Sequence, residues 1–246
     1  MDKKLELINS FKVIKSKGWI PTHRHGDQAL GNAFEDLLNV SENNSEEADF
    51  HGIEFKSQRT TSSALMTLFS KAPTYPRGVN TSLRETYGVV EDTHGKRILN
   101  TTFTGDRENT HRGGYNYKAR VDREKRIIHL EIRNQETGIL EDFEVWWSFS
   151  VLEDALRKKL KTIAILHGDE KVEAGQRYVR YTKMDILTGL TLEKMITSLE
   201  DGELFIDIRI GVYSSGKHIG KTHDHGTAFR IKLDKLLTYG DVESYE

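Results

Sequence analysis

The sequence predicts a mixed α+β fold, an α/β protein whose sheets are not built from repeated βαβ units. Helical apolar patterns and strand patterns both occur along the chain, and they follow one another in no regular order. The 246 residues suffice for one large domain or two small lobes with a substantial core. No segment rich in Pro, Gly or Ser separates two lobes, so we expect them to share an intimate interface.

The N-terminal half predicts two helices, one strand and two less regular segments. Apolar residues at helical spacing predict helices over residues 5–18 and 30–38, and residues 49–58 have the pattern of a strand. Residues 62–71 are expected to form a short helix. Residues 72–117 contain few apolar residues and many Gly, Thr, Arg and Asn, so we expect mostly loop. A long irregular segment in a compact domain is more typical of function than of mere connection.

The C-terminal half predicts a second series of strands and helices. Residues 126–133 and 143–150 flank a turn at 136–138 and predict a hairpin. The remaining segments, in order, are a helix over 150–160, a buried strand over 161–168, a strand over 177–187, a helix over 191–202, a strand over 204–213 and a closing segment over 226–237.

The composition excludes several kinds of site. The chain has no Cys, so it contains neither disulfides nor thiolate zinc sites, and a reducing compartment is expected. No apolar run approaches the roughly 18 residues that cross a bilayer, and the charged N-terminal segment lacks the apolar core of a signal peptide. We therefore expect a cytoplasmic protein. A formal net charge of -2, taken alone, argues against a polyanionic partner.

The charge is distributed unevenly, which changes that last inference. Residues 35–54 contain seven acidic residues and no Lys or Arg, and outside them 36 Lys and Arg face 31 Asp and Glu. Residues 96–126 and 207–232 are locally basic and contain interleaved Tyr or His. A cationic surface around one acidic spot is what a metal-dependent enzyme acting on a polyanion needs. For either basic stretch alone, an ordinary solvated face is the favoured interpretation.

The segment DFHGIEFK (49–56) has a pattern that suits chemistry on phosphodiesters. In a strand Glu54 and Lys56 share one face while Ile53 and Phe55 point into the core, and a bend at Gly52 brings Asp49 back beside Glu54. Two carboxylates so placed suit Mg²⁺, and a nearby ammonium suits a scissile phosphate and the attacking water.

This pattern is short, and a surface strand with a Glu–Lys pair is the more frequent explanation for it. The apolar second face of the strand and the acid on the preceding helix favour the catalytic interpretation. Glu35 on that helix is expected to complete the site through a metal-bound water.

A second constellation lies near the C-terminus. Asp207 and Arg209 share one face of a predicted strand, and Tyr213 and a Gly-rich segment with His223, Asp224 and His225 follow, before Arg230 closes the series. A zinc site is disfavoured because no third ligand stands at a matching spacing. Arg and His donate to guanine and Asp accepts from cytosine, so the cluster suits reading of G·C pairs. A polar loop with incidental histidines explains the residues equally well at this point.

The chain resembles the MvaI/BcnI family of restriction endonucleases over nearly its whole length, and is more similar to MvaI than to BcnI. The resemblance rests on GNAFEDLL (31–38), ADFHGIEFK (48–56), LFSKAPTYPRGVN (68–80), Tyr-Asn-Tyr (115–117), WWSF (146–149), and above all DIRIG (207–211) with GKTHDHGTAFRI (220–231).

This resemblance implies a PD-(D/E)XK nuclease core related to MutH, with a mixed sheet flanked by helices and two lobes that form a DNA-binding cleft. The Pro of that motif name is absent, since Ala48 precedes Asp49. By position, the catalytic set is Asp49, Glu54 and Lys56, with Glu35 as an accessory acid and with Asp49 and Glu54 as the Mg²⁺ ligands. The residues implied to face the DNA are Asp207, Arg209, Tyr213, His223, Asp224, His225 and Arg230.

We therefore expect a type II restriction endonuclease that cuts double-stranded DNA at a CCNGG-like site, CCWGG above all, as a monomer that cuts the strands in turn. A cognate DNA methyltransferase of the same system is implied, in a bacterial or archaeal cell. The expected catalytic lobe is 1–170 and the recognition lobe 171–246. The alternatives are a MutH-like strand-nicking repair endonuclease and a catalytically silent DNA-binding module.

Overall fold

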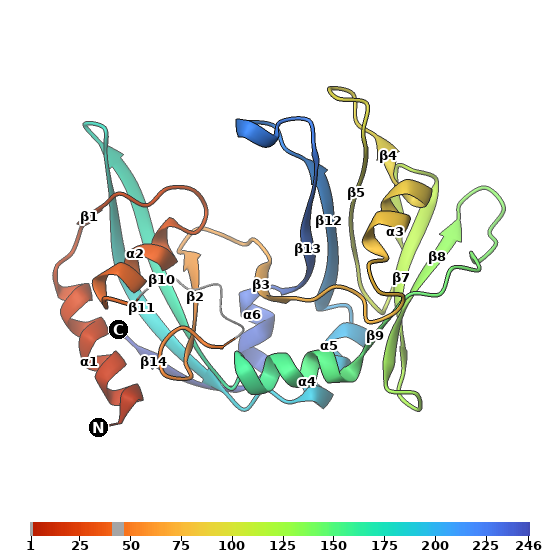
Figure 1. Ribbon diagram of the computed structural model, residues 1–246. Coiled ribbons are helices and arrows are strands. Elements are labelled where there is room, and N and C mark those ends of the chain that lie inside the picture. The colour runs from red at the N-terminus through yellow and green to blue at the C-terminus, as the bar shows by residue number, and fades with distance from the viewer. Residues whose placement is uncertain (1, 41–46) are drawn as a thin grey trace. The chain divides into compact units, whose positions relative to one another are not determined.

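The computed structural model describes residues 2–40 and 47–246 (Figure 1). Glu42 and Glu46 of the acidic window lie outside the described residues. The chain forms two compact units. Unit 1 comprises Met1–Met66, Ala155–Thr191 and Leu233–Glu246, and unit 2 comprises Thr67–Asp154 and Leu192–Lys232. The mixed α+β class predicted from the sequence is confirmed.

Unit 1 is built on one sheet of five strands in the order β1-β11-β10-β2, with β14 also paired to β11. Its elements are α1 (Lys3–Ser16), β1 (Ile20–Thr22), α2 (Ala29–Leu37), β2 (Glu54–Arg59), β10 (Thr162–Glu173), β11 (Gln176–Thr188), α6 (Leu233–Leu236), η2 (Leu237–Tyr239) and β14 (Asp241–Tyr245). The edge strand β2 pairs in parallel with β10, whose apolar run at 163–166 is fully buried. Such continuous burial is typical of a strand covered on both faces.

Helices α1 and α2 pack on one face of this sheet through a core of aromatic and aliphatic side chains. Phe34 lies at its centre, with its ring edge-on to Phe55 at 5.4 Å and to Tyr181 at 5.2 Å between ring centroids. Helix α1 begins at Asp2, whose side chain accepts a hydrogen bond from the amide of Lys4. The buried apolar residues of this helix are Leu7, Ile8, Phe11 and Ile14. Leu5, with which the predicted helix begins, is exposed.

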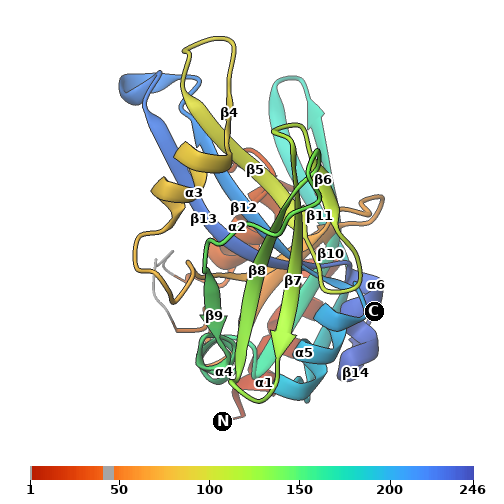
Figure 2. The ribbon, with the colours of Figure 1, turned by 90° about the vertical axis from the view of Figure 1, so that its right-hand side faces the viewer.

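Unit 2 contains two sheets, ordered β3-β13-β12-β5-β4 and β6-β7-β8-β9 (Figures 1 and 2). Its elements are β3 (Met66–Ser70), α3 (Asn80–Tyr87), β4 (Val89–Val90), β5 (Arg97–Phe103), β6 (Asn109–His111), β7 (Tyr115–Asp122), β8 (Ile127–Asn134), β9 (Trp146–Ser148), α4 (Phe149–Lys158, which continues into unit 1), α5 (Leu192–Glu200), β12 (Leu204–Val212), η1 (Gly216–His218) and β13 (Thr222–Ile231). Trp147, on β9 of the second sheet, is fully buried and contacts Phe103 and Phe229 of the first sheet, which joins the two sheets into one core.

Two expectations about the middle of the chain are wrong. The segment 62–71 contains strand β3 rather than a helix, because Met66 and Leu68 are buried in alternation and β3 pairs with β13. The segment 72–117 is not mostly loop, since it contains helix α3 and strands β4 to β6. Its apolar residues are few, but several are buried, Leu83 and Leu99 completely so. A segment with sparse apolar residues therefore folds through tertiary packing rather than through its local pattern.

The other predicted elements are present. The hairpin of residues 126–150 is β8 and a shortened β9, and the helices over 150–160 and 191–202 are α4 and α5. Strand β14 was not predicted. In the described residues no helix has the length and apolar character to cross a membrane.

The two units differ from the expected lobes, which had a single boundary near residue 170. That boundary falls inside the hairpin of β10 and β11, where Glu173 is aligned with Gln176. The chain instead passes between the units four times, at residues 66, 154, 191 and 232.

Candidate functional site

Strand β2 carries Glu54 and Lys56 on one face of the unit 1 sheet. In the parallel pairing Glu54 is aligned with Ile163 and Lys56 with Ile165, while Phe55 points to the opposite face and into the core, as strand alternation predicts. Glu54 is only 4% exposed, and the ammonium of Lys56 donates a hydrogen bond to its Oε1 at 2.7 Å. A lysine and a glutamate are thus paired at the edge of a rigid sheet.

A tight turn returns Asp49 to the start of this strand. His51 and Gly52 have φ angles of 48° and 89°, and Phe50 and Ile53 exchange two backbone hydrogen bonds of 2.9 Å across them. Two central residues with positive φ form the type I′ turn that best fits a twisted hairpin. The carboxylate of Asp49 then accepts a hydrogen bond of 2.8 Å from the amide of Phe55, the residue next to Glu54.

The second oxygen of Glu54 is available to a ligand. Oε2 is buried and has no hydrogen-bond partner, and the Lys159 ammonium lies 3.8 Å from it. Buried carboxylate oxygens are rarely left without such a partner. Together with Asp49 it offers the hard oxygen ligands that divalent cations prefer, so the donor set fits such an ion. Within residues 2–40 and 47–246, no three or more His, Cys, Asp or Glu side chains converge as a metal cluster.

The acids of helix α2 have separate surroundings. Asp36 forms a bidentate pair with Arg24, with N–O distances of 2.9 and 2.7 Å, and this guanidinium holds the pKa of Asp36 below its usual value. Glu35 is half-buried and does not join Asp49 and Glu54 in a described cluster of three. Part of the acidic window is therefore neutralised within the protein, by Arg24 and by Lys56.

In unit 2 the first sheet has one core face and one polar face. Ile206 and Ile208 on β12 are fully buried, so alternation puts Asp207 and Arg209 on the other face. Asp207 is itself 6% exposed, because its two oxygens accept hydrogen bonds of 2.8 Å from Thr102 and from Arg230. Asp207 therefore orients Arg230 rather than presenting a free acceptor.

Arg209 lies at an irregularity of the β12–β13 ladder. The register shifts between Ile208 and Ile210, and the Arg209 guanidinium donates to the backbone oxygens of His225 at 3.0 Å and Gly226 at 3.3 Å. A bulge re-aims side chains next to functional sites. Here it anchors a half-exposed guanidinium beside the histidines.

Aromatic side chains form a row along the end of the β12–β13 hairpin. Ring centroids are 4.1 Å apart for Tyr213 and His223, and 3.9 Å for His223 and His225. Burial, His223 and Arg209 lower the pKa of His225. Asp224, in contrast, is aligned with Ile210 and accepts hydrogen bonds from the side chain of Asn80 and the amide of Gly226. Its carboxylate therefore points toward α3, away from the row.

Comparison with known proteins identifies the relatives of this chain. The MvaI/BcnI restriction endonuclease family matches residues 8–238. The chain belongs to this family. Among solved structures, a complex described as restriction endonuclease MvaI with cognate DNA substrate is 41% identical, with a TM-score of 0.92, and the match covers 99% of this chain and 98% of that one. Restriction endonuclease MvaI in the absence of DNA is 40% identical, with a TM-score of 0.65 and the same coverage. No curated protein sequence matches.

Membership of the MvaI/BcnI restriction endonuclease family makes the protein a type II site-specific deoxyribonuclease. Enzymes of this kind generally use a divalent metal ion, in agreement with the carboxylates at β2.

Two residues of this MvaI/BcnI enzyme were not anticipated. Lys159, just after α4, approaches Glu54, and its only sequence signal is a basic helix end. Asn100 on β5 is exposed and aligned with Arg209 on the polar face. Asn100 was missed because residues 72–117 were expected to be mostly loop, so the alternation of side chains along a strand was not applied to them.

Proposed function

We propose that this enzyme hydrolyses phosphodiester bonds of double-stranded DNA with Mg²⁺ at a CCNGG-like site, CCWGG above all. The arrangement at β2 carries the proposal: a buried Glu54 has one oxygen held by Lys56 and the other without a hydrogen-bond partner, with Asp49 beside it. The 41% identity to MvaI in complex with its cognate DNA supports the choice of substrate.

Each residue of this site has a proposed role. Asp49 and Glu54 hold the cation, which when bound supplies Lewis-acid polarisation of the scissile phosphate. Lys56 orients the attacking water and donates to a phosphate oxygen, which offsets the charge that develops there. Its pairing with Glu54 fixes the ammonium before DNA arrives. We assign Glu35 the accessory role of holding a water beside the ion.

We propose that the polar face of the first unit 2 sheet reads the base pairs in the major groove. Arg209 and His225 supply donors suited to guanine O6 and N7, and the His223 ring lies edge-on to His225 with Tyr213 beside it. Arg230, oriented by Asp207, adds a further donor. We assign Asp224 the role of fixing the shape of this hairpin end, because its carboxylate accepts hydrogen bonds from Asn80 and Gly226.

The oligomeric state, the order of strand cleavage and the cellular setting are proposed from the family resemblance. We propose a monomer that cuts the two strands in turn, in the cytoplasm of a bacterium or archaeon, alongside a methyltransferase that protects the same site.

Plasmid cleavage tests the proposal. Purified protein with Mg²⁺ and no added partner is expected to linearise a plasmid that carries one CCWGG site, through a nicked intermediate, and sequencing the ends gives target and cut position together. Persistent nicks without linear product would indicate a MutH-like nicking enzyme instead. Absence of any cleavage, with DNA binding retained, would indicate a silent binding module.

A further inference from the structure

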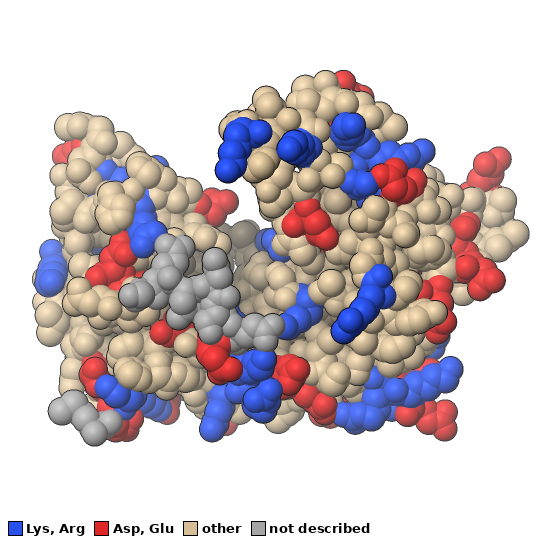
Figure 3. Space-filling view, in the orientation of Figure 1, with Lys and Arg blue, Asp and Glu red and all other residues tan. Residues whose placement is uncertain are grey.

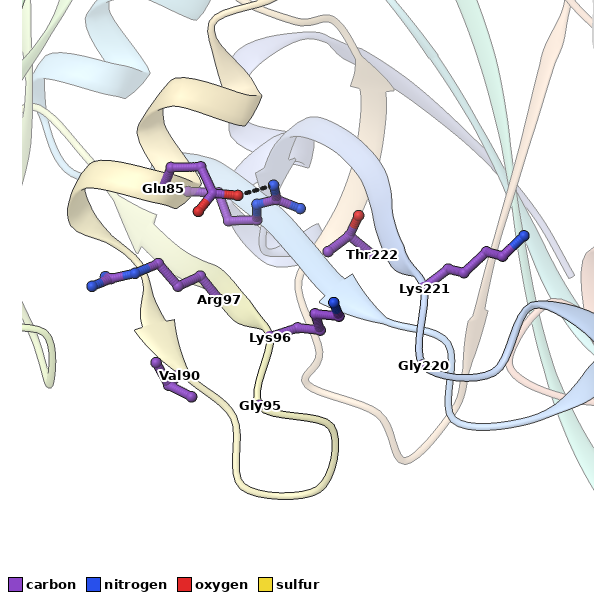
Figure 4. A pocket seen from close by; sticks show the side chains of 9 residues that line it. Glu85, Val90, Gly95, Lys96, Arg97, Gly220, Lys221 and Thr222 are labelled. Carbon is purple, nitrogen blue, oxygen red and sulfur yellow. Dashed lines mark hydrogen bonds and ion pairs between the residues drawn. The ribbon is translucent and has the colours of Figure 1, made fainter.

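A basic pocket in unit 2 lies outside the residues assigned so far. It has a volume of about 750 Å³ and is lined by Arg84, Glu85, Val90, Gly95, Lys96, Arg97, Gly220, Lys221 and Thr222 (Figure 4). These residues come from α3, from β4, β5 and the loop that joins them, and from the start of β13 and the loop before it. Blue side chains gather at this end of unit 2 in Figure 3.

The pocket suits an anion. Four of its lining residues are cationic and one is acidic. The acid, Glu85, is already paired with the guanidinium of Arg84. Arg97 donates to the backbone oxygen of Gly88 at 2.6 Å, which leaves Lys96 and Lys221 as exposed ammonium groups. The excess positive charge is therefore not neutralised within the pocket.

A second observation points to a ligand. The Nε of Arg84 is buried and has no hydrogen-bond partner, although the side chain is 12% exposed. A buried guanidinium donor without an acceptor is costly, and a phosphate oxygen is a good acceptor for it. The hydroxyl of Thr222 points into the same space and adds a neutral donor (Figure 4).

Lys96 and Lys221 of the pocket lie close in the sequence to strands of the proposed base-reading face. Thr222 directly precedes His223 on β13, and Lys96 precedes the strand that carries Asn100. Lys96 and Lys221 extend to the same side in Figure 4 and Arg97 to the opposite side. Because side chains alternate along β5 and β13, the side chains of Asn100 and His223 are expected to point to this same side.

We propose that this pocket binds a backbone phosphate of the DNA duplex outside the base pairs that the enzyme reads. Lys96 and Lys221 contact the phosphate at the rim, and Arg84 donates from behind. This inference rests on the proposed function, since it assumes that the polar face of the sheet meets DNA. Contacts of this kind position a protein on the duplex and carry no sequence information.

The test removes the two rim charges in the full-length protein. Lys96→Gln with Lys221→Gln is compared with Lys125→Gln with Lys232→Gln, which removes two exposed lysines elsewhere in unit 2. Binding is measured in Ca²⁺ over a salt series. The duplexes carry the same site with flanks that are either minimal or extended by about one helical turn of roughly ten base pairs on each side.

The rim variant is expected to bind the extended duplex more weakly, equally for cognate and non-cognate sequence, with the slope of log K against log salt reduced by about 1–2. Its binding to the minimal duplex should match that of the control variant. A rim variant that equals the control on both duplexes would overturn the proposal.

Free phosphate is the other source of the same chemistry. Acetylation of Lys96 and Lys221 in the wild-type protein is followed with extended duplex or with inorganic phosphate. Protection by the duplex alone supports the backbone assignment. Protection by phosphate, together with normal duplex binding by the rim variant, would assign the pocket to a free anion and overturn it. Cleavage in Mg²⁺ is scored separately, so an inactive protein with an intact phosphate site contradicts only the proposed function.

Discussion

At the scale of single residues, Glu54 is distinctive because its two oxygens have different environments. Oε1 accepts a hydrogen bond from Lys56, whereas Oε2 is buried and has no hydrogen-bond partner. Asp207 shows the opposite arrangement, with both oxygens engaged by Thr102 and Arg230. A buried carboxylate that is fully engaged orients its neighbours, and one with an unengaged oxygen can still take a ligand.

Lys56→Ala is expected to lower the cleavage rate by at least about 100- to 1,000-fold, because it removes a preorganised donor from the developing charge. DNA binding in Ca²⁺ should be unchanged. Lys12→Ala, an exposed lysine on α1, is the control and should cleave normally. Plasmid cleavage and filter binding measure the two effects. Normal cleavage by Lys56→Ala would show that the active site lies elsewhere.

Arg209→Ala and His225→Ala are each expected to weaken specific DNA binding by about 1–3 kcal/mol, the value of a well-made base contact. The ratio of cognate to non-cognate affinity should fall, which loss of a phosphate contact would not cause. Arg120→Ala removes an exposed arginine on β7 of the same unit and serves as the control. Unchanged discrimination in both variants would refute the base-reading role.

At the scale of elements, the proposed active site depends on one turn and one edge strand. The turn at His51–Gly52 holds Asp49 against the start of β2, and β2 is an edge strand that pairs in parallel with β10. In unit 2, the bulge in the β12–β13 hairpin similarly sets the position of Arg209. The turn and the bulge are both local features of the backbone at rigid strands. Such features hold the side chains that they position in place.

Gly52→Ala tests the turn. The added Cβ meets nothing within 4 Å, so the cost is the strain of a positive φ of 89°, about 1–2 kcal/mol of stability. Gly138 also has a positive φ and open space, and it lies in the loop between β8 and β9. Both alanine variants should lose similar stability in urea unfolding, but only Gly52→Ala should cleave more slowly. Equal cleavage by the two folded variants would argue against a role for Asp49.

At the scale of the whole molecule, two histidines of unit 2, His111 and His129, have lowered pKa values and so favour the neutral state. Burial lowers the pKa of His111, with a further contribution from Arg112, and burial with Arg120 lowers that of His129. The unfolded chain therefore binds protons more readily than the folded protein below about pH 6.5, the ordinary histidine value. The stability that these groups contribute is present above that pH and is lost as the pH falls.

His111→Phe tests this dependence, since phenylalanine keeps the ring contact with Tyr117 without titrating. Its free energy of unfolding should fall less steeply below pH 6.5, by at most about 1.4 kcal/mol per pH unit for one proton. Thr110→Ala changes an exposed neighbour on β6 that does not titrate, and it should leave the slope as in the wild type. A wild-type slope in His111→Phe would contradict the assignment.

The predictive power of the sequence was greatest where pattern and packing agree. The strand faces of Glu54, Lys56, Asp207 and Arg209 follow from alternation. Strands β3 and β5 were missed because they pair with β13 and β12, which lie far away in the chain. Strands β4 and β6 pair with near neighbours but are only two and three residues long. The hydrogen bond from Arg230 to Asp207 and the orientation of the Asp224 carboxylate depend on side-chain contacts. The spacing of residues in the sequence does not predict such contacts.

The parallel pairing of β2 has a consequence for how the enzyme is made. Residues 54–59 leave the ribosome about a hundred residues before β10, the strand they pair with, and the sheet is complete only after β14. Until β10 has been made, Glu54 and Lys56 lie on a strand without its pairing partner, and the proposed catalytic geometry cannot form. We therefore expect an unfinished chain to be inactive, so that a cell translating this nuclease meets its activity only in chains that have formed the sheet.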